Sequence, residues 1–347
     1  MTADRPRVGW YIHHHGHGHL HRALAVGAEL GRRGSEVTVL SSLAPDAAHA
    51  GPWVRLPRDD GGDPAALSDP TARGRLHWAP VHHDGLRERT HLVSAWIAEH
   101  RPDVVVCDVS QEVALLCRLH GVPVVSVVQP GDRGDGPHRL GLGLAAALVG
   151  CWPAGAGDLV TGLPATDVRR VVPVGGLSRF PVAPALPAAE RTDEVVVFGG
   201  SGGAAWTPAQ LDALEARAGR PVRVLGTGSW EERPFDRLRA AALVVVQAGQ
   251  NALAEVAAAR VPAVVVPADR PHDEQRTTAR RLARGDWPVR VLDRLEHDDW
   301  PRLLAEVAGL DGARWESWCD GGAAARFADV VLDVAAGARH PDDGLVA

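Results

Sequence analysis

The sequence predicts an α/β protein made of two doubly wound domains, each built on a parallel sheet. Segments typical of buried strands alternate with segments of helical periodicity along most of the chain, a pattern that indicates repeated strand–helix units. The 347 residues are long for one hydrophobic core and natural for two. Residues 178–193 contain three prolines and no periodicity, which is typical of a semi-rigid linker between domains.

The first domain is predicted to span residues 1–177. Apolar runs rich in Val, Ile and Leu predict its strands at 8–12, 37–40, 104–107, 124–128 and 171–177. Apolar residues that recur every three to four positions predict helices after residue 20, at 86–99 and at 113–119. Residues 43–80 are rich in Pro, Gly, Asp and Trp, and no pattern predicts their structure.

The second domain is predicted to span residues 194–312, with a C-terminal segment at 313–340. The same reasoning predicts strands at 195–198, 221–225, 243–246, 263–266 and 289–292. Helices are expected at 235–242, from 249 to about 260, and at 301–308. A long C-terminal helix is expected over 315–336.

Composition narrows the classes of function. The net charge of −6 argues against nucleic acid as the main partner. Arginine supplies all 37 cationic side chains, so lysine-based covalent catalysis is excluded. Four scattered cysteines and a short polar N-terminus without a signal-peptide pattern favour a cytoplasmic protein. The longest apolar run, 141–151, is too short to cross a bilayer, so we expect at most a peripheral contact with a membrane.

A ligand site is predicted where the third strand of the second domain ends. Gly249 follows this strand and opens a helix, and a glycine there lets the free helix N–H groups approach an anion. Glu255, two turns along, offers a carboxylate that accepts two hydroxyl hydrogen bonds, as a sugar diol requires. Together they indicate a site for a nucleotide diphosphate-sugar. The glycine loop 199–203 offers further backbone N–H groups to phosphate, although it also fits a plain tight turn or a loose dinucleotide pattern.

The order of strand, Gly249, Glu255, strand, proline and Asp273-Glu274-Gln275 resembles the donor-binding half of GT-B glycosyltransferases. It is most similar to the family that adds N-acetylglucosamine to lipid-linked muramyl-peptide. The resemblance implies two Rossmann-like domains facing across a cleft, with the C-terminal helix packed back on the first. It implies a nucleotide-sugar donor, with UDP as the family's usual nucleotide, and a small-molecule, glycan or lipid-linked acceptor. No cofactor and no metal are expected.

The resemblance also assigns residues to the donor. Glu255 would bind the ribose hydroxyls, and Asp273, Glu274 and Gln275 the sugar hydroxyls. Thr278-Ala279 stands where the family often has Asn-Ala, a departure that affects the sugar contacts. The other donor-binding residues implied are Gly18, Gly200, Ser201, Gly202, Gly226, Thr227, Gly249, Gln250 and Asn251.

The histidine-rich loop 13–22 follows the first strand. A metal site there is disfavoured, because adjacent histidines rarely converge on one ion and no acidic partner is expected nearby, although adventitious nickel or zinc binding is expected. A dinucleotide fingerprint fails, because His21 replaces its third glycine. The third interpretation is an acceptor loop that resembles the first loop and helix of GT-B enzymes, where His19 matches the histidine that serves as general base in some relatives.

Asp108 closes the strand at 104–108 and resembles the aspartate that orients this histidine. A carboxylate behind the imidazole fixes its tautomer and stabilises the imidazolium. The competing interpretation makes Asp108 the N-cap of the next helix. Glu112 is a weaker candidate for contact with the acceptor.

These features predict an inverting, metal-independent glycosyltransferase. No Asp-x-Asp motif follows a strand; the close pairs Asp59-Asp60 and Asp298-Asp299 lie in predicted loops. Three alternatives stay open: a nucleotide-sugar epimerase of the same fold, a pyridine-nucleotide oxidoreductase that uses the loop after 198, and a sensor of nucleotide sugars without catalysis.

Overall fold

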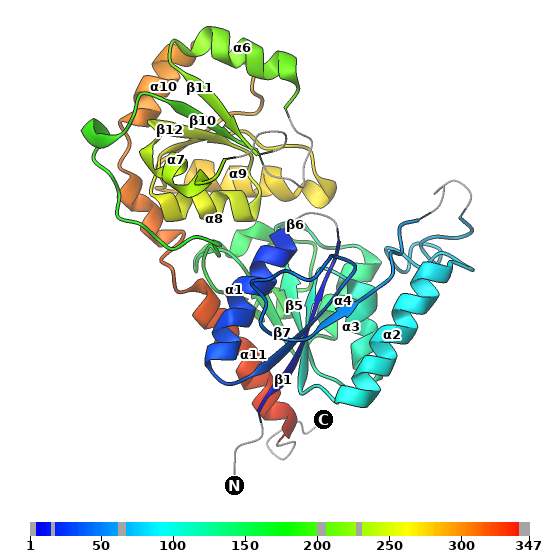
Figure 1. Ribbon diagram of the computed structural model, residues 1–347. Coiled ribbons are helices and arrows are strands. Elements are labelled where there is room, and N and C mark those ends of the chain that lie inside the picture. Colours follow the sequence, from blue (N-terminus) through cyan, green and yellow to red (C-terminus); the bar gives the residue numbers. More distant parts are fainter. Residues whose placement is uncertain (1–4, 15–17, 62–66, 200–205, 227–230, 340–347) are drawn as a thin grey trace.

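Two parallel sheets, of seven and five strands, organise the chain in the computed structural model, which describes residues 5–14, 18–61, 67–199, 206–226 and 231–339. Each sheet has its own helices, and the two units lie one above the other in Figure 1. We call the unit with the seven-stranded sheet the first domain and the other the second domain. The predicted α/β class with two parallel sheets is confirmed.

The first sheet has the strand order β3-β2-β1-β4-β5-β7-β9. Every neighbouring pair is parallel, and the valine-rich strands are covered on both faces, as parallel sheets require. The strands are β1 Arg7–Ile12, β2 Glu36–Ser41, β3 Trp53–Arg55, β4 Val104–Asp108, β5 Val124–Val128, β7 Ala147–Gly150 and β9 Val171–Pro173.

Helices cover both faces of this sheet. They are α1 Gly18–Arg32, α2 Asp84–His100, α3 Gln111–Leu119 and α4 Gly136–Gly143, joined by the C-terminal α11 Ala323–Arg339. The short α5 Ala165–Val168 precedes β9 and has no buried residue. Side chains alternate across a strand, so Trp10 points into the core beneath α1 and α11, whereas Tyr11 points into the core beneath α2 and α3. A small pair of strands, β6 Gly131–Asp132 and β8 Val160–Thr161, and a 3-10 turn, η2 Gly157–Leu159, lie beyond the sheet.

The second sheet has the order β11-β10-β12-β13-β14. Its strands are β10 Val195–Phe198, β11 Val222–Leu225, β12 Leu243–Val246, β13 Ala263–Val265 and β14 Val289–Val291. Its helices are α6 Pro208–Ala218, α7 Pro234–Ala240, α8 Gln250–Ala259, α9 Glu274–Arg284 and α10 Trp300–Ala308, with 3-10 turns η3 Ala188–Glu190, η4 Pro271–Asp273 and η5 Gly312–Ser317.

The predicted C-terminal helix over 315–336 is wrong at its beginning. Trp315 lies in η5 and is buried in the core of the second domain, together with Trp318. Gly321, with φ of +84°, and Gly322 then interrupt the helical run, because a left-handed residue cannot continue an α-helix. The helix α11 starts only at Ala323.

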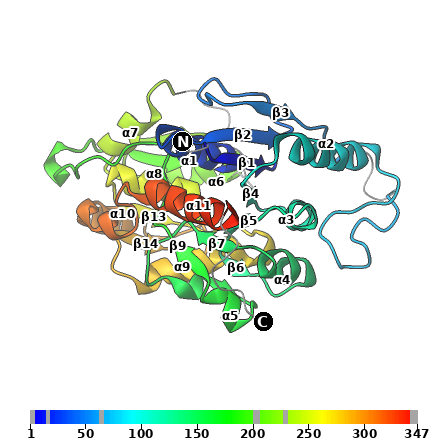
Figure 2. The same cartoon turned by 90° about the horizontal axis from the view of Figure 1, so that it is seen from below.

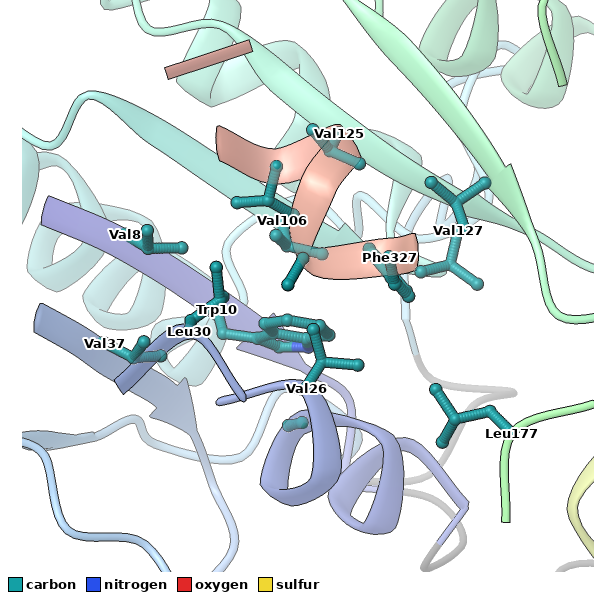
Figure 3. Packing of buried hydrophobic residues seen from close by; sticks show 14 of the residues in the cluster. Val8, Trp10, Val26, Leu30, Val37, Val106, Val125, Val127, Leu177 and Phe327 are labelled. Carbon is teal, nitrogen blue, oxygen red and sulfur yellow. The ribbon is translucent and has the colours of Figure 1, made fainter. Parts of the chain in front are cut away.

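Helix α11 lies against α1 and the first sheet, as Figures 1 and 2 show. Its Phe327 ring stands 5.3 Å from the ring of Trp10, and both side chains are fully buried. Figure 3 shows Phe327 above Trp10, with Val26 close to the Trp10 ring and Val127, on β5, close to Phe327. A segment that follows the second domain in sequence therefore completes the core of the first.

The two domains meet where β6 and η2 contact η4 and α9. Arg281 of α9 lies 3.4 Å from the carboxylate of Asp158. Gly131 has φ of +107°, and a Cβ atom at this position would overlap the carbonyl oxygen of His272, so only glycine permits this approach. Among the described residues, no helix is long and apolar enough to span a membrane.

Candidate active site

A cavity of about 1520 Å³ lies between the two domains and is lined by residues of both. The carboxyl ends of parallel strands carry the ligand sites of open α/β sheets, and the loops after β1, β4, β10 and β12 all reach this cavity. Of the residues predicted to bind the donor, Gly18, Gly226, Gly249, Gln250, Asn251, Glu255, Glu274 and Gln275 line it. Gly200, Ser201, Gly202 and Thr227 lie outside the described residues.

The predicted pair of His19 and Asp108 is brought together. Nδ1 of His19, in the first turn of α1, lies 3.0 Å from Oδ1 of Asp108, the last residue of β4. His19 lines the cavity, whereas Asp108 lies fully buried behind it. The competing role of Asp108 as a helix cap is wrong, because the Ser110 hydroxyl accepts the Val113 N–H and caps α3.

Arg22 is a third member of this group that sequence analysis missed. It lies one turn after His19 on α1, and its Nη1 donates to both carboxylate oxygens of Asp108 at 2.6 Å. Burial opposes ionisation of Asp108, but Arg22 and His19 outweigh it and hold the pKa of this carboxyl below its ordinary value. Asp108 therefore stays ionised behind His19.

The backbone next to Asp108 is strained. Val109 has φ of +88°, an outlier for a β-branched residue, and it lines the cavity. Such conformations persist only where surrounding contacts enforce them, and they concentrate at functional sites.

The N-terminus of α8 points at the cavity without a side-chain cap. Gly249 is its N-cap residue, and no side chain accepts the first helical N–H groups, which leaves them for a ligand. Gly18, at the start of α1 in the first domain, lies close to Asn251 of α8. A Cβ atom at Gly18 would overlap the Asn251 side-chain amide. The starts of α1 and α8 thus face each other from opposite domains.

Glu255 is buried in the wall of the cavity and is paired with Arg179. Nε of Arg179 lies 3.0 Å from Oε1 of Glu255, and this arginine follows β9 in the segment predicted as the linker. Burial raises the pKa of Glu255 to about 7, against the opposing effect of Arg179. No sequence pattern predicts this pair, because Arg179 lies 76 residues before Glu255 in the chain.

Glu274 and Gln275 begin α9 and line the cavity, whereas Asp273 does not. Burial raises the pKa of Glu274, although Arg133 and Arg270 oppose the effect. Oε1 of Gln275 accepts the Ala268 N–H at 2.8 Å. The carboxylate of Asp273 instead pairs with Arg280 on the exposed side of α9, so its position lends no support to a sugar contact.

Glu112 anchors part of the chain whose structure the sequence did not predict. Its Oε1 accepts the backbone N–H of His77 at 2.7 Å and that of Trp78 at 3.3 Å. All three residues line the cavity. Glu112 therefore holds a cavity wall, and its carboxylate is already engaged in doing so.

The histidine-rich loop has an acidic neighbour in space. Nε2 of His14 lies 2.9 Å from Asp60, and Nδ1 lies 3.9 Å from Asp59. The expectation that no acid lies near this loop is thus wrong, because residues 59 and 60 fold back from the stretch without a readable pattern. His13, His14 and Asp59 are close enough for one ion, but Arg89 also pairs with Asp59 at 3.3 Å.

A second group of histidines was missed by sequence analysis. His77, Asp135, His138 and His272 place their ligand atoms within 4.8 Å of one another. We call these four residues the interdomain histidine cluster, because His272 belongs to the second domain and the other three to the first. Burial lowers the pKa of His138 to about 4, against the opposing effect of Asp135, so this imidazole is neutral at pH 7.

Comparisons with known proteins agree with this architecture. Residues 233–289 match the glycosyltransferase family 28 C-terminal domain, a segment that contains Gly249, Glu255 and Gln275. A search of curated protein sequences found no significant match.

Solved structures match the chain over nearly its whole length. The glycotransferase of kitacinnamycin aligns with a TM-score of 0.65 and 18% identity, covering 95% of this chain and 100% of its own. MurG from Acinetobacter baumannii aligns with a TM-score of 0.61 and 18% identity, covering 94% and 99%. UGT89C1 from Arabidopsis thaliana, complexed with UDP, aligns with a TM-score of 0.60 and 14% identity, covering 95% and 100%.

The fold is therefore that of the GT-B glycosyltransferases, and the predicted resemblance is confirmed. Within this class, the match at 233–289 is to the family 28 C-terminal domain, and MurG is among the similar structures.

Proposed function

We propose that the protein is an inverting, metal-independent glycosyltransferase that moves a sugar from a nucleotide diphosphate-sugar, with UDP as the expected nucleotide, to an acceptor hydroxyl. The observation that carries this proposal is the contact between His19 and buried Asp108, at a cavity wall that faces the uncapped start of α8. One side of the cavity thus offers a base, and the other offers donors to an anion.

In the proposed reaction, the free ring nitrogen of His19 removes the proton of the acceptor hydroxyl. The oxygen attacks the anomeric carbon, and the bond from that carbon to the diphosphate oxygen breaks. Asp108 keeps the other ring nitrogen protonated and stabilises the imidazolium that forms. Direct displacement by the acceptor inverts the anomeric configuration.

The diphosphate gains negative charge as it leaves. The N–H groups at the start of α8 and the positive end of its helix dipole stabilise this charge without a cation. Glu255 would accept the ribose hydroxyls from its place two turns further along α8. Glu274 and Gln275, at the start of α9, remain the proposed contacts to the sugar.

The acceptor would lie against the first domain. The cavity wall there includes Trp78, Leu86, Val93 and Leu116, which favours an acceptor with an apolar surface, because such a surface is desolvated at little loss. This wall belongs to the domain that also carries His19, as an acceptor site requires.

The test compares His19→Ala with wild type in transfer assays that use a panel of nucleotide sugars and apolar hydroxyl acceptors. We expect transfer to fall by roughly 10²–10⁴-fold, while calorimetry shows nearly unchanged donor binding. His21→Ala is the matched control, because His21 also lines the cavity but contacts Arg179 rather than Asp108, and it should keep most activity. Wild-type transfer by the His19 variant would remove this residue as the base. Sugar isomerisation without an acceptor would favour the epimerase.

A further inference from the structure

The interdomain histidine cluster gathers its side chains around one carboxylate. Asp135 lies 3.3 Å from Nε2 of His77, 2.6 Å from Nδ1 of His138 and 3.5 Å from Nδ1 of His272. The ring centroid of His138 lies 4.5 Å from that of His77 and 4.8 Å from that of His272. Three imidazoles so close together cannot all be protonated, because the three positive charges would repel one another strongly.

Local structure holds each member in place. Asp135 is the N-cap residue of α4, and its Oδ1 accepts the N–H of His138 at 2.9 Å. His77 is fixed through its backbone N–H by Glu112. His272 has φ of +62°, an uncommon conformation for a residue other than glycine, and its carbonyl packs against Gly131 of the first domain.

We propose that the interdomain histidine cluster binds a zinc ion that ties the two domains together. Three imidazole nitrogens and one carboxylate oxygen are a donor set for zinc, whereas calcium and magnesium prefer oxygen ligands alone. In a tetrahedral site with bonds of about 2.0–2.1 Å, ligand atoms stand roughly 3.3–3.4 Å apart. The distances from Oδ1 of Asp135 to His77 and from Oδ2 to His272 are close to this spacing. The 2.6 Å contact between Oδ2 and Nδ1 of His138 is a hydrogen bond, and it would lengthen when the ion replaces its proton.

Binding requires each imidazole to offer a lone pair. His138 would bind through Nδ1, which faces Asp135, and would then carry its proton on Nε2. Arg133 lies 3.3 Å from that Nε2 and would turn from it. Arg133 keeps its hydrogen bonds to the carbonyl oxygens of Gln129 and Pro130, so its guanidinium remains satisfied.

The consequence is a link between metal binding and domain closure. His272 is the sole ligand from the second domain, so the complete site exists only while η4 lies against the first domain. By mass action, an ion that needs all four ligands stabilises this closed arrangement. His77, His138 and His272 line the cavity, but all four positions of the ion are taken by protein, so the ion has no place for substrate.

To test this, the full chain is first freed of metal with a chelator. It is then titrated with Zn²⁺ in the presence of a chromophoric chelator that competes for the ion. Co²⁺ serves as a second probe, because tetrahedral Co²⁺ has strong visible absorption. We expect one tight site in wild type. His272→Ala should weaken zinc binding by more than about 100-fold and change the Co²⁺ spectrum. Small-angle scattering should show that Zn²⁺ lowers the radius of gyration of the wild-type protein but not that of this variant.

The control removes the other candidate ligands with His13→Ala/His14→Ala. This double variant should keep zinc affinity within about threefold of wild type, which separates the cluster from adventitious binding at the histidine-rich loop. Circular dichroism and nucleotide binding check that each variant is folded. Equal zinc affinity in wild type and His272→Ala, or loss of the tight site in the double variant, would overturn the proposal. Neither outcome bears on whether His19 is the base.

Discussion

Among the residues proposed to contact the donor, Glu255 has a carboxyl pKa far above its ordinary value. Its pKa is about 7 in the folded protein, against 4.5 for a free side chain. Between these values the unfolded chain has lost the proton and the folded chain still holds it. The unfolded state therefore binds fewer protons, so Glu255 makes stability fall as pH rises from about 4.5 to 7, with no further change above.

Nucleotide binding should follow the same titration. If the ribose diol requires the carboxylate, affinity should rise about tenfold between pH 6 and pH 8, as the ionised fraction of Glu255 grows. Glu255→Gln should remove this dependence and weaken binding at pH 8 by about 1.5–3 kcal/mol. Calorimetry in two buffers of different ionisation enthalpy measures both affinity and the proton released. A flat pH profile in wild type would exclude the carboxylate from the ribose site.

Sequence patterns located the individual residues better than their partners. His19 and Asp108 could be paired beforehand, because the resemblance to GT-B enzymes implied the pair, and the strands beside which they stand, β1 and β4, are neighbours in the sheet. Arg22 and Arg179 could not, since their acidic partners lie 86 and 76 residues away in sequence. Long-range ion pairs leave no local periodicity. The catalytic and binding roles themselves stay predictions.

Among elements, predictability followed length and apolar content. β4, β5 and β12 each contain three or four valines and were predicted within a residue. β3 was missed because its three residues lie in a stretch rich in turn-forming residues, and β7 was missed within an apolar run that gives no strand boundary. Short strands owe their conformation to neighbouring strands rather than to their own sequence.

The contact between β6 and η4 depends on one glycine. Gly131→Ala should destabilise the protein by roughly 1–3 kcal/mol and weaken zinc binding, because the added methyl group meets the His272 carbonyl in a left-handed conformation. Gly157→Ala in η2 is the matched control, since nothing stands within 4 Å of its Cβ position. Denaturant unfolding and zinc titration of both variants test this. Equal unfolding free energies and zinc affinities in the two variants would mean that the packing of the domains does not depend on this contact.

Across the whole molecule, charge compensation at the cavity is expected to come from protein alone. Transfer should continue in excess chelator, because the start of α8 replaces a cation at the diphosphate and a four-ligand zinc site, which acts only on the closed arrangement of the domains, offers no position to substrate. Rates measured with EDTA, and after Mg²⁺ or Mn²⁺ is added back, test this. Loss of activity that either ion restores would contradict the metal-independent mechanism.

The return of α11 to the first domain has a consequence for synthesis. During translation, β1 to β9 leave the ribosome first, yet the core around Trp10 lacks Phe327 and its neighbours until α11 has emerged. The five-stranded sheet and the helices on it are made in between, from residues adjacent in sequence. The first domain is thus made before the helix that completes its core, so its apolar face under α11 stays uncovered until the second domain has been synthesised.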